Sequence, residues 1–157
     1  MSMPGRIMAL DVGEVRTGVA VTDPMQIIAS PHCVVQEKSL EAALERIAAL
    51  TRELEPVLLV IGVPLDREGQ PGAQARKVER FIEALEPRID VPIHRQDERY
   101  STAGAERMLI DANMRRIKRK NVVDKIAATH ILEAYLQGKH RAQHYRLHDA
   151  LGCLGLA

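Results

Sequence analysis

The feature that most constrains the fold is a continuous apolar run, VLLVIGVP, at residues 57–64. The run is rich in β-branched residues and shows no alternation between apolar and polar side chains. A strand of this type is buried on both faces, as strands are in parallel sheets that helices cover on both sides. We therefore expect an α/β domain that contains this run as a fully buried strand.

Shorter apolar runs predict further strands. RIMALDV and TGVAVTD flank the short segment GEVR, a pattern typical of a hairpin. The run IIASPHCVVQ predicts a third strand, interrupted near Pro31, and VPIHR predicts a short strand later in the chain.

Helical spacing of apolar residues predicts the remaining elements. Residues 39–55 form one such stretch, for which Ser39 is a suitable N-cap and Pro56 a stop. Further helices are predicted to end near Glu86, to begin near Ser101 or Thr102, and to run from about Asn121 to Gln137. The order β-β-β-α-β-α-β-α-α contains βαβ units, so we expect a mixed sheet with helices on both faces.

The bulk properties favour a single cytoplasmic domain. At 157 residues the chain has the length of about one domain. No apolar run approaches the roughly 20 residues that span a bilayer, and the opening residues lack the hydrophobic segment of a secretory signal. Cys33 and Cys153 lack the spacing of a metal motif. We therefore expect a cytoplasmic protein without membrane contacts.

The charge distribution points to local rather than global binding of anions. A net charge of +1 argues against a globally basic nucleic-acid binder. The segment RRIKRK, at residues 115–120, nevertheless has a single residue that is not basic. Such a local patch can bind phosphate although the total charge is near zero.

Three acidic residues lie where a site would be expected. Asp11 ends the first strand, Glu98 follows the strand VPIHR, and Asp124 belongs to the first turn of the last helix. In open α/β sheets, functional groups gather beyond the carboxyl ends of parallel strands. Converging carboxylates repel one another unless a cation neutralises them, and Mg²⁺ or Mn²⁺ suits such oxygen ligands. Two such ions support phosphodiester hydrolysis.

Basic residues near these acids are candidates for holding phosphate. The predicted nucleic-acid-binding residues are Arg16, Arg99, Arg115, Arg116, Lys118, Arg119 and Lys120.

Each acid also has a simpler explanation. Asp11 with Gly13 is ordinary turn chemistry, and Glu98 could belong to a solvated cluster with its charged neighbours. Asp124 lies three residues after Asn121, as in a helix cap. The basic run is equally compatible with a solvated surface. From these residues alone, a metal-dependent phosphodiesterase is one of several readings.

Four ordered segments resemble the YqgF (RuvX) family, which is described as Holliday-junction-resolvase-like and as nucleases of pre-16S rRNA. They are ALDVGEVRTGVAVTD, VIGVPLDREGQPGAQA, DERYSTAGAERML and KRKNVVDKIAATHILEAYL. The resemblance implies an RNase H-like fold: a five-stranded mixed sheet with three leading antiparallel strands, flanked by helices on both faces. We therefore assign residues 1–138 to an RNase H-like nuclease domain and residues 139–157 to a tail of unassigned role.

The resemblance also implies an activity and a site. Asp11, Glu98 and Asp124 match the family's acidic residues, which are taken to be catalytic and to hold Mg²⁺ or Mn²⁺. The implied reaction is endonucleolytic trimming of pre-16S rRNA near its 5′ end, within or beside a pre-ribosomal particle. One residue departs from the family pattern, because Val15 stands where a basic residue is usual, whereas Arg16 is kept.

Two other functional classes remain open at this stage. The same fold could be a module that binds structured RNA or branched DNA with little turnover, although a pure binder has no need to gather repelling carboxylates. An ATPase of the actin and sugar-kinase type also has Asp-x-Gly before a strand, but it binds nucleotide between two domains and this chain has room for one. An aromatic content of 3% favours a structured substrate held by its backbone over one read by stacking.

Overall fold

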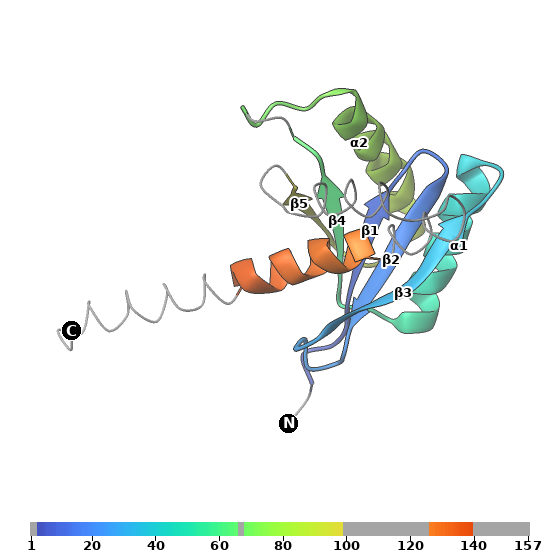
Figure 1. The fold of residues 1–157 in the computed structure, drawn as a ribbon. Helices are drawn as coiled ribbons and strands as arrows, with labels where there is room; N and C mark the ends of the chain where they lie inside the picture. The colour runs from blue at the N-terminus through green and yellow to red at the C-terminus, as the bar shows by residue number, and fades with distance from the viewer. Residues whose placement is uncertain (1–2, 66–67, 99–125, 140–157) are drawn as a thin grey trace, which may run out of the picture.

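The computed structural model describes residues 3–65, 68–98 and 126–139. Five strands of this part form one sheet, in the order β3-β2-β1-β4-β5 (Figure 1). Strands β1, β2 and β3 pair antiparallel, whereas β4 pairs parallel with both β1 and β5. The strand bounds are Ile7–Val12, Arg16–Thr22, Ala29–Gln36, Leu58–Val63 and Ile93–Asp97. The mixed sheet with three leading antiparallel strands is therefore confirmed.

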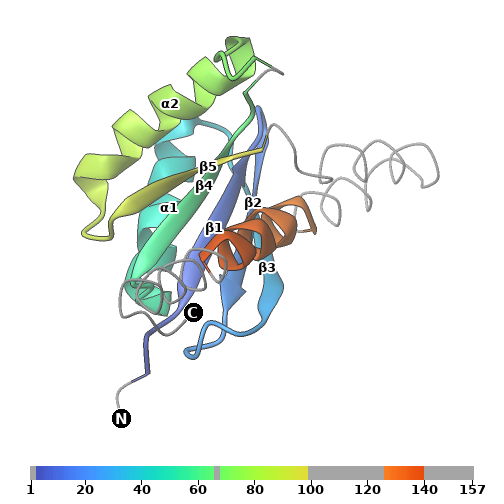
Figure 2. The ribbon, with the colours of Figure 1, turned by 90° about the vertical axis from the view of Figure 1, so that its left-hand side faces the viewer.

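Helices cover both faces of the sheet (Figure 2). Helix α1, Leu40–Leu54, and helix α2, Ala73–Leu85, lie on one face, and the helical residues 126–139 lie on the other. The predicted cap of α1 is confirmed, because Ser39 accepts a hydrogen bond of 3.1 Å from the backbone N–H of Ala42.

Two details differ from the expected helices. A short 3₁₀ helix, Glu86–Arg88, follows α2 directly. The last helix continues to residue 139, two residues beyond the predicted end at Gln137. The helix expected to begin near Ser101 or Thr102 lies outside the described residues.

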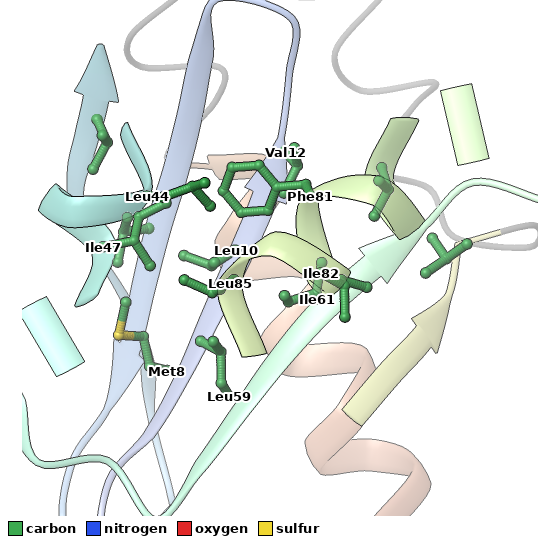
Figure 3. Close-up of a cluster of buried hydrophobic side chains, with 14 of the residues drawn as sticks. Met8, Leu10, Val12, Leu44, Ile47, Leu59, Ile61, Phe81, Ile82 and Leu85 are labelled. Carbon is green, nitrogen blue, oxygen red and sulfur yellow. The ribbon is translucent and has the colours of Figure 1, made fainter. Parts of the chain in front are cut away.

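Strand β1 is packed on both faces. Met8, Leu10 and Val12 point toward α1 and α2, where they join a cluster that includes Leu44 and Phe81 (Figure 3). The alternate residues of the strand pack on the other face. There Ile7 and Ala9 contact the helix at residues 126–139 through Ala128, Ile131 and Leu132.

Strand β4 has the same double burial. Leu59 and Ile61 belong to the cluster under α1 and α2, and Val60 belongs to the cluster on the opposite face. The absence of alternation in VLLVIGVP is explained by this arrangement.

The loop between β2 and β3 is held by one carboxylate. The Asp23 side chain accepts hydrogen bonds from the backbone N–H groups of Ile28, Ile27 and Met25, at 2.7, 2.8 and 3.0 Å. These bonds favour the ionised form, so they lower the pKa of Asp23, with the bond from Ile28 as the largest cause.

We predict a pH-dependent stability defect for Asp23→Ala. A carboxyl with a lowered pKa stabilises the fold fully above its unfolded-state pKa of about 3.9, and this contribution is lost as the pH falls through the folded-state pKa. The midpoint difference between wild type and variant in thermal unfolding should therefore be larger at pH 7 than at pH 3. Asp90→Ala, at an exposed position, is the control. An Asp23→Ala defect of equal size at both pH values would contradict the prediction.

Candidate active site at the carboxyl edge of the sheet

Asp11 lies near the carboxyl end of β1, on the face covered by residues 126–139. It continues the alternation of Ile7 and Ala9, and it is 8% exposed. The parallel register pairs Leu10 with Ile61 of β4. One step further along this register, Asp11 lies beside Gly62.

Glu98 reaches the same face from β5. It follows the strand directly, and its backbone N–H donates a 3.1 Å hydrogen bond to the carbonyl of Val63. His94 shows which face this is, because its ring packs on Tyr135 of the covering helix with a centroid distance of 5.0 Å. Residues 94, 96 and 98 alternate onto this face, so the Glu98 side chain lies on the same side as Asp11.

The neighbouring acid, Asp97, belongs to the opposite face. It alternates with Arg95, whose Nε donates to Glu79 of α2 at 2.8 Å. The structure therefore separates two adjacent carboxylates that the sequence left as one charged cluster.

Gly62 creates the space in which the Glu98 carboxyl lies. A Cβ atom on Gly62 would be 2.7 Å from Cδ of Glu98, 3.0 Å from its Oε1 and 2.6 Å from Cδ1 of Ile131. The carboxyl group of Glu98 thus lies over β4, the strand between β5 and β1. Asp11 and Glu98 consequently flank one glycine on one face of the sheet. The sequence carries one local signal of this role, a glycine inside a β-branched run, and that signal did not predict it.

The hairpin between β1 and β2 positions Arg16. The Gly13 N–H donates to the Arg16 carbonyl at 2.8 Å, and a Cβ on Gly13 would lie 2.5 Å from that carbonyl oxygen. Asp11 pairs with Gly18, and two residues earlier on the same strand Arg16 alternates onto the face of Asp11. The Arg16 Nε donates to Oε1 of Gln36 on β3 at 3.2 Å.

The other predicted site residues lie outside the described residues. They are Asp124, Arg99, Arg115, Arg116, Lys118, Arg119 and Lys120. Within the described part, no group of three His, Cys, Asp or Glu side chains is placed to hold a metal ion. The same part contains no helix long and apolar enough to cross a membrane.

Comparison with known families decides the relationship. A family model described as "RuvX: Holliday junction resolvase" matches residues 5–138. The chain belongs to the RuvX family. The resemblance seen in the four sequence segments is thereby confirmed.

Two similar proteins match this chain over nearly their whole length. A protein of Roseiflexus sp. (strain RS-1), named "Putative pre-16S rRNA nuclease", is 44% identical over 138 residues, which are 88% of this chain and 98% of that protein. A protein of Syntrophomonas wolfei with the same name is 41% identical over 140 residues, 89% of this chain and 99% of that one.

Solved structures with this fold include a viral resolvase. The fowlpox virus resolvase in complex with Holliday junction DNA is 10% identical, with a TM-score of 0.52 and coverage of 85% of this chain and 97% of that one. A second structure of the fowlpox virus Holliday junction resolvase is 17% identical with a TM-score of 0.50, over 85% and 98% of the two chains. The likeness shows the RNase H-like fold of the RuvX chain.

We predict that Gly62→Ala destabilises the protein by about 1–3 kcal/mol, the usual cost of an extra methyl group in a packed site. The new methyl would meet Glu98 and Ile131 below 3 Å, so one of these side chains must move. Urea denaturation measures the change. Gly138→Ala is the matched control, because among the described residues no atom outside its own helix turn and chain neighbours lies within 4 Å of the Cβ position. Equal stability of the Gly62→Ala variant and the wild type would show that the carboxyl of Glu98 does not occupy this space.

Proposed function

We propose that this RuvX-family protein is a metal-dependent endonuclease that trims the 5′ end of pre-16S rRNA. The observation that carries the proposal is the placement of Asp11 and Glu98 on either side of Gly62, at the carboxyl edge of the sheet. The names of the close relatives supply the substrate. The position supports a catalytic role, because parallel strands direct their functional groups to this edge.

The two carboxylates fit a divalent cation. Asp11 is 8% exposed, and it faces the same side of the sheet as the Glu98 carboxylate, so a bound cation would balance two negative charges. Carboxylate oxygens are the ligands that Mg²⁺ and Mn²⁺ prefer. Asp11 and Glu98 would hold such an ion, which would supply charge stabilisation for the attacking and leaving oxygens of a phosphodiester.

Asp124 is the proposed third ligand, because it matches the third acidic residue of the family pattern. It precedes the helix at residues 126–139 by two positions in the sequence, and Ile131 of that helix lies beside Gly62.

The protein's own side chains would orient the substrate. Arg16 presents a guanidinium on the face of Asp11, where it can bind a phosphate oxygen flanking the reacting one. Its hydrogen bond to Gln36 leaves the terminal nitrogens of the guanidinium for such a contact. Strand β1, packed on both faces, holds Asp11 rigidly while substrate binds.

Branched DNA is the second candidate substrate. The description of the matching family model names Holliday junction resolution. The same carboxylates would serve either substrate, because hydrolysis of the phosphodiester is identical in RNA and DNA. Incubation with precursor rRNA and with a four-way DNA junction, each with Mn²⁺ or EDTA, separates the candidates.

We predict that Asp11→Asn and Glu98→Gln each lower cleavage by about a thousandfold or more, since metal stabilisation is worth several kcal/mol and each 1.4 kcal/mol is tenfold in rate. Asp97→Asn is the matched control, because that carboxylate belongs to the opposite face. Single-turnover rates on the cleaved substrate measure the effect, and circular dichroism verifies folding.

Three results would reject the nuclease proposal. One is cleavage that survives both substitutions, and another is cleavage that persists in EDTA. The third is salt-dependent binding of RNA without products in Mg²⁺ or Mn²⁺, which would identify a binding module.

A further inference from the structure

A hollow lies on the side of the β1–β2 hairpin opposite the carboxylates. It consists of two adjoining cavities of about 440 and 230 Å³, which share Gly13, Glu14, Leu40 and Phe81. The larger volume is within the range of about 300–1,000 Å³ typical of small-molecule sites. The hollow therefore has room for a nucleotide-sized group.

The hollow presents exposed apolar side chains. Leu40, at the start of α1, is 58% exposed, and Val15, at the tip of the hairpin, is 63% exposed. Phe81 of α2 contributes to the wall of both cavities. Apolar side chains that line a cavity of this size, with a few charged groups beside them, are the composition of a small-molecule site.

Two cations of α2 line the larger cavity. Lys77 and Arg80 lie about one turn apart on the helix. Arg80 forms no ion pair with any residue that the structure describes, so its charge is available. Gln74, on the same helix, donates to the Val12 carbonyl at 3.3 Å and ties α2 to the hairpin.

Lys77 is held by a carboxylate that a phosphate could replace. It forms an ion pair with Glu14 at the tip of the hairpin, and the two side chains are 52% and 67% exposed. The bond from Lys77 lowers the pKa of Glu14, so the carboxylate is ionised at neutral pH. Exposed pairs of this kind contribute little stability. A phosphate group can therefore displace Glu14 at small cost.

The hollow and the candidate active site lie on opposite faces of the end of strand β1. Asp11 presents its side chain on one face of β1, and the next residue, Val12, lines the hollow on the other face. A nucleic-acid strand that crosses the end of β1 would place neighbouring nucleotides on the two sides.

We propose that this hollow binds one unpaired nucleotide next to the scissile bond of a structured substrate. The base would contact Leu40, Val15 and the edge of Phe81. Its phosphate would bind Lys77 and Arg80 and displace Glu14 from the ion pair. The proposal takes its substrate class from the proposed function, but binding in the hollow requires no cleavage.

Val15 gains a role in this arrangement. The family pattern has a basic residue at this position, and the exposed valine offers an apolar contact in its place. In this proposal, Val15 contacts the base at the edge of the site, where a basic residue would contact a phosphate.

The test is nucleic-acid binding in EDTA, measured by fluorescence anisotropy. A duplex with a short single-stranded overhang is compared with the same duplex without it, in RNA and DNA versions. Leu40→Gln should weaken binding of the overhang substrate by about fivefold, because it removes apolar area that the base would bury. The blunt duplex should bind Leu40→Gln and wild type equally.

The charged residues have a separate readout. Arg80→Ala should reduce the slope of log K against log salt by about 0.7 for the overhang substrate, as expected when one contact to a single strand is lost. Glu14→Gln should tighten binding of this substrate, because it frees Lys77. Arg52→Ala is the matched control, an exposed arginine in the last turn of α1, whereas the hollow lies at the start of that helix.

The outcomes separate this proposal from the nuclease. Equal effects of Leu40→Gln and Arg80→Ala on blunt and overhang substrates, or no effect on either, would overturn the nucleotide site even if Asp11→Asn abolishes cleavage. Selective loss of overhang binding would support the site even if no substrate is cleaved. A Glu14→Gln variant that binds the overhang more weakly than wild type would reject the displacement step.

Discussion

Burial of β1 on both faces is the constraint on which the site depends. The strand carries Met8 and Leu10 into the core under α1 and α2, and Ile7 and Ala9 into the core under residues 126–139. Each large apolar side chain contributes about 1.5–3 kcal/mol when fully buried, so both cores fix the same short strand. This packing also fixes the position of Asp11, because Asp11 is the next residue of β1 on the face of the covering helix. The catalytic role proposed for Asp11 requires such a rigid position, because catalysis tolerates little displacement.

Two neighbouring residues at the end of β1 face opposite sides of the sheet, and each side has a different candidate site. Asp11 points toward the carboxylate site, and Val12 points toward the hollow lined by Leu40 and Phe81. A register shift of one residue would exchange them, because every side chain of a slipped strand changes face. Pairing of β1 with β2 on one side and β4 on the other prevents this shift. The same pairing that builds the sheet therefore also keeps the acid and the apolar wall on their own sides.

The sequence predicted the elements well because their signals are local. Ser39 caps α1 through a bond that spans three residues, and residues 59–63 of the run VLLVIGVP are buried, as their continuous apolar composition predicts. From the sequence, Glu98 was a candidate by its position after the strand VPIHR and by its match to the family motif, but its separation from Asp97 was not predicted. Its physical reason is the pairing of β5 with β4, a contact between distant segments. The role of Gly62 and the hollow escaped prediction for the same reason, since both depend on side chains from several elements meeting in space.

Although the net charge is +1, the basic residues differ in whether an acidic side chain balances their charge. Arg88 binds Glu41 and Glu45 of α1, and Arg95 binds Glu79 of α2, so these guanidinium groups join elements and their charge is locally balanced. Arg16 instead hydrogen-bonds a neutral amide, and Lys77 pairs with an exposed glutamate at the hairpin tip. Phosphate would find available positive charge on both sides of the β1 end rather than over the surface as a whole. Attraction of nucleic acid to this one edge requires local placement of a few cations, and a nearly neutral chain can supply it.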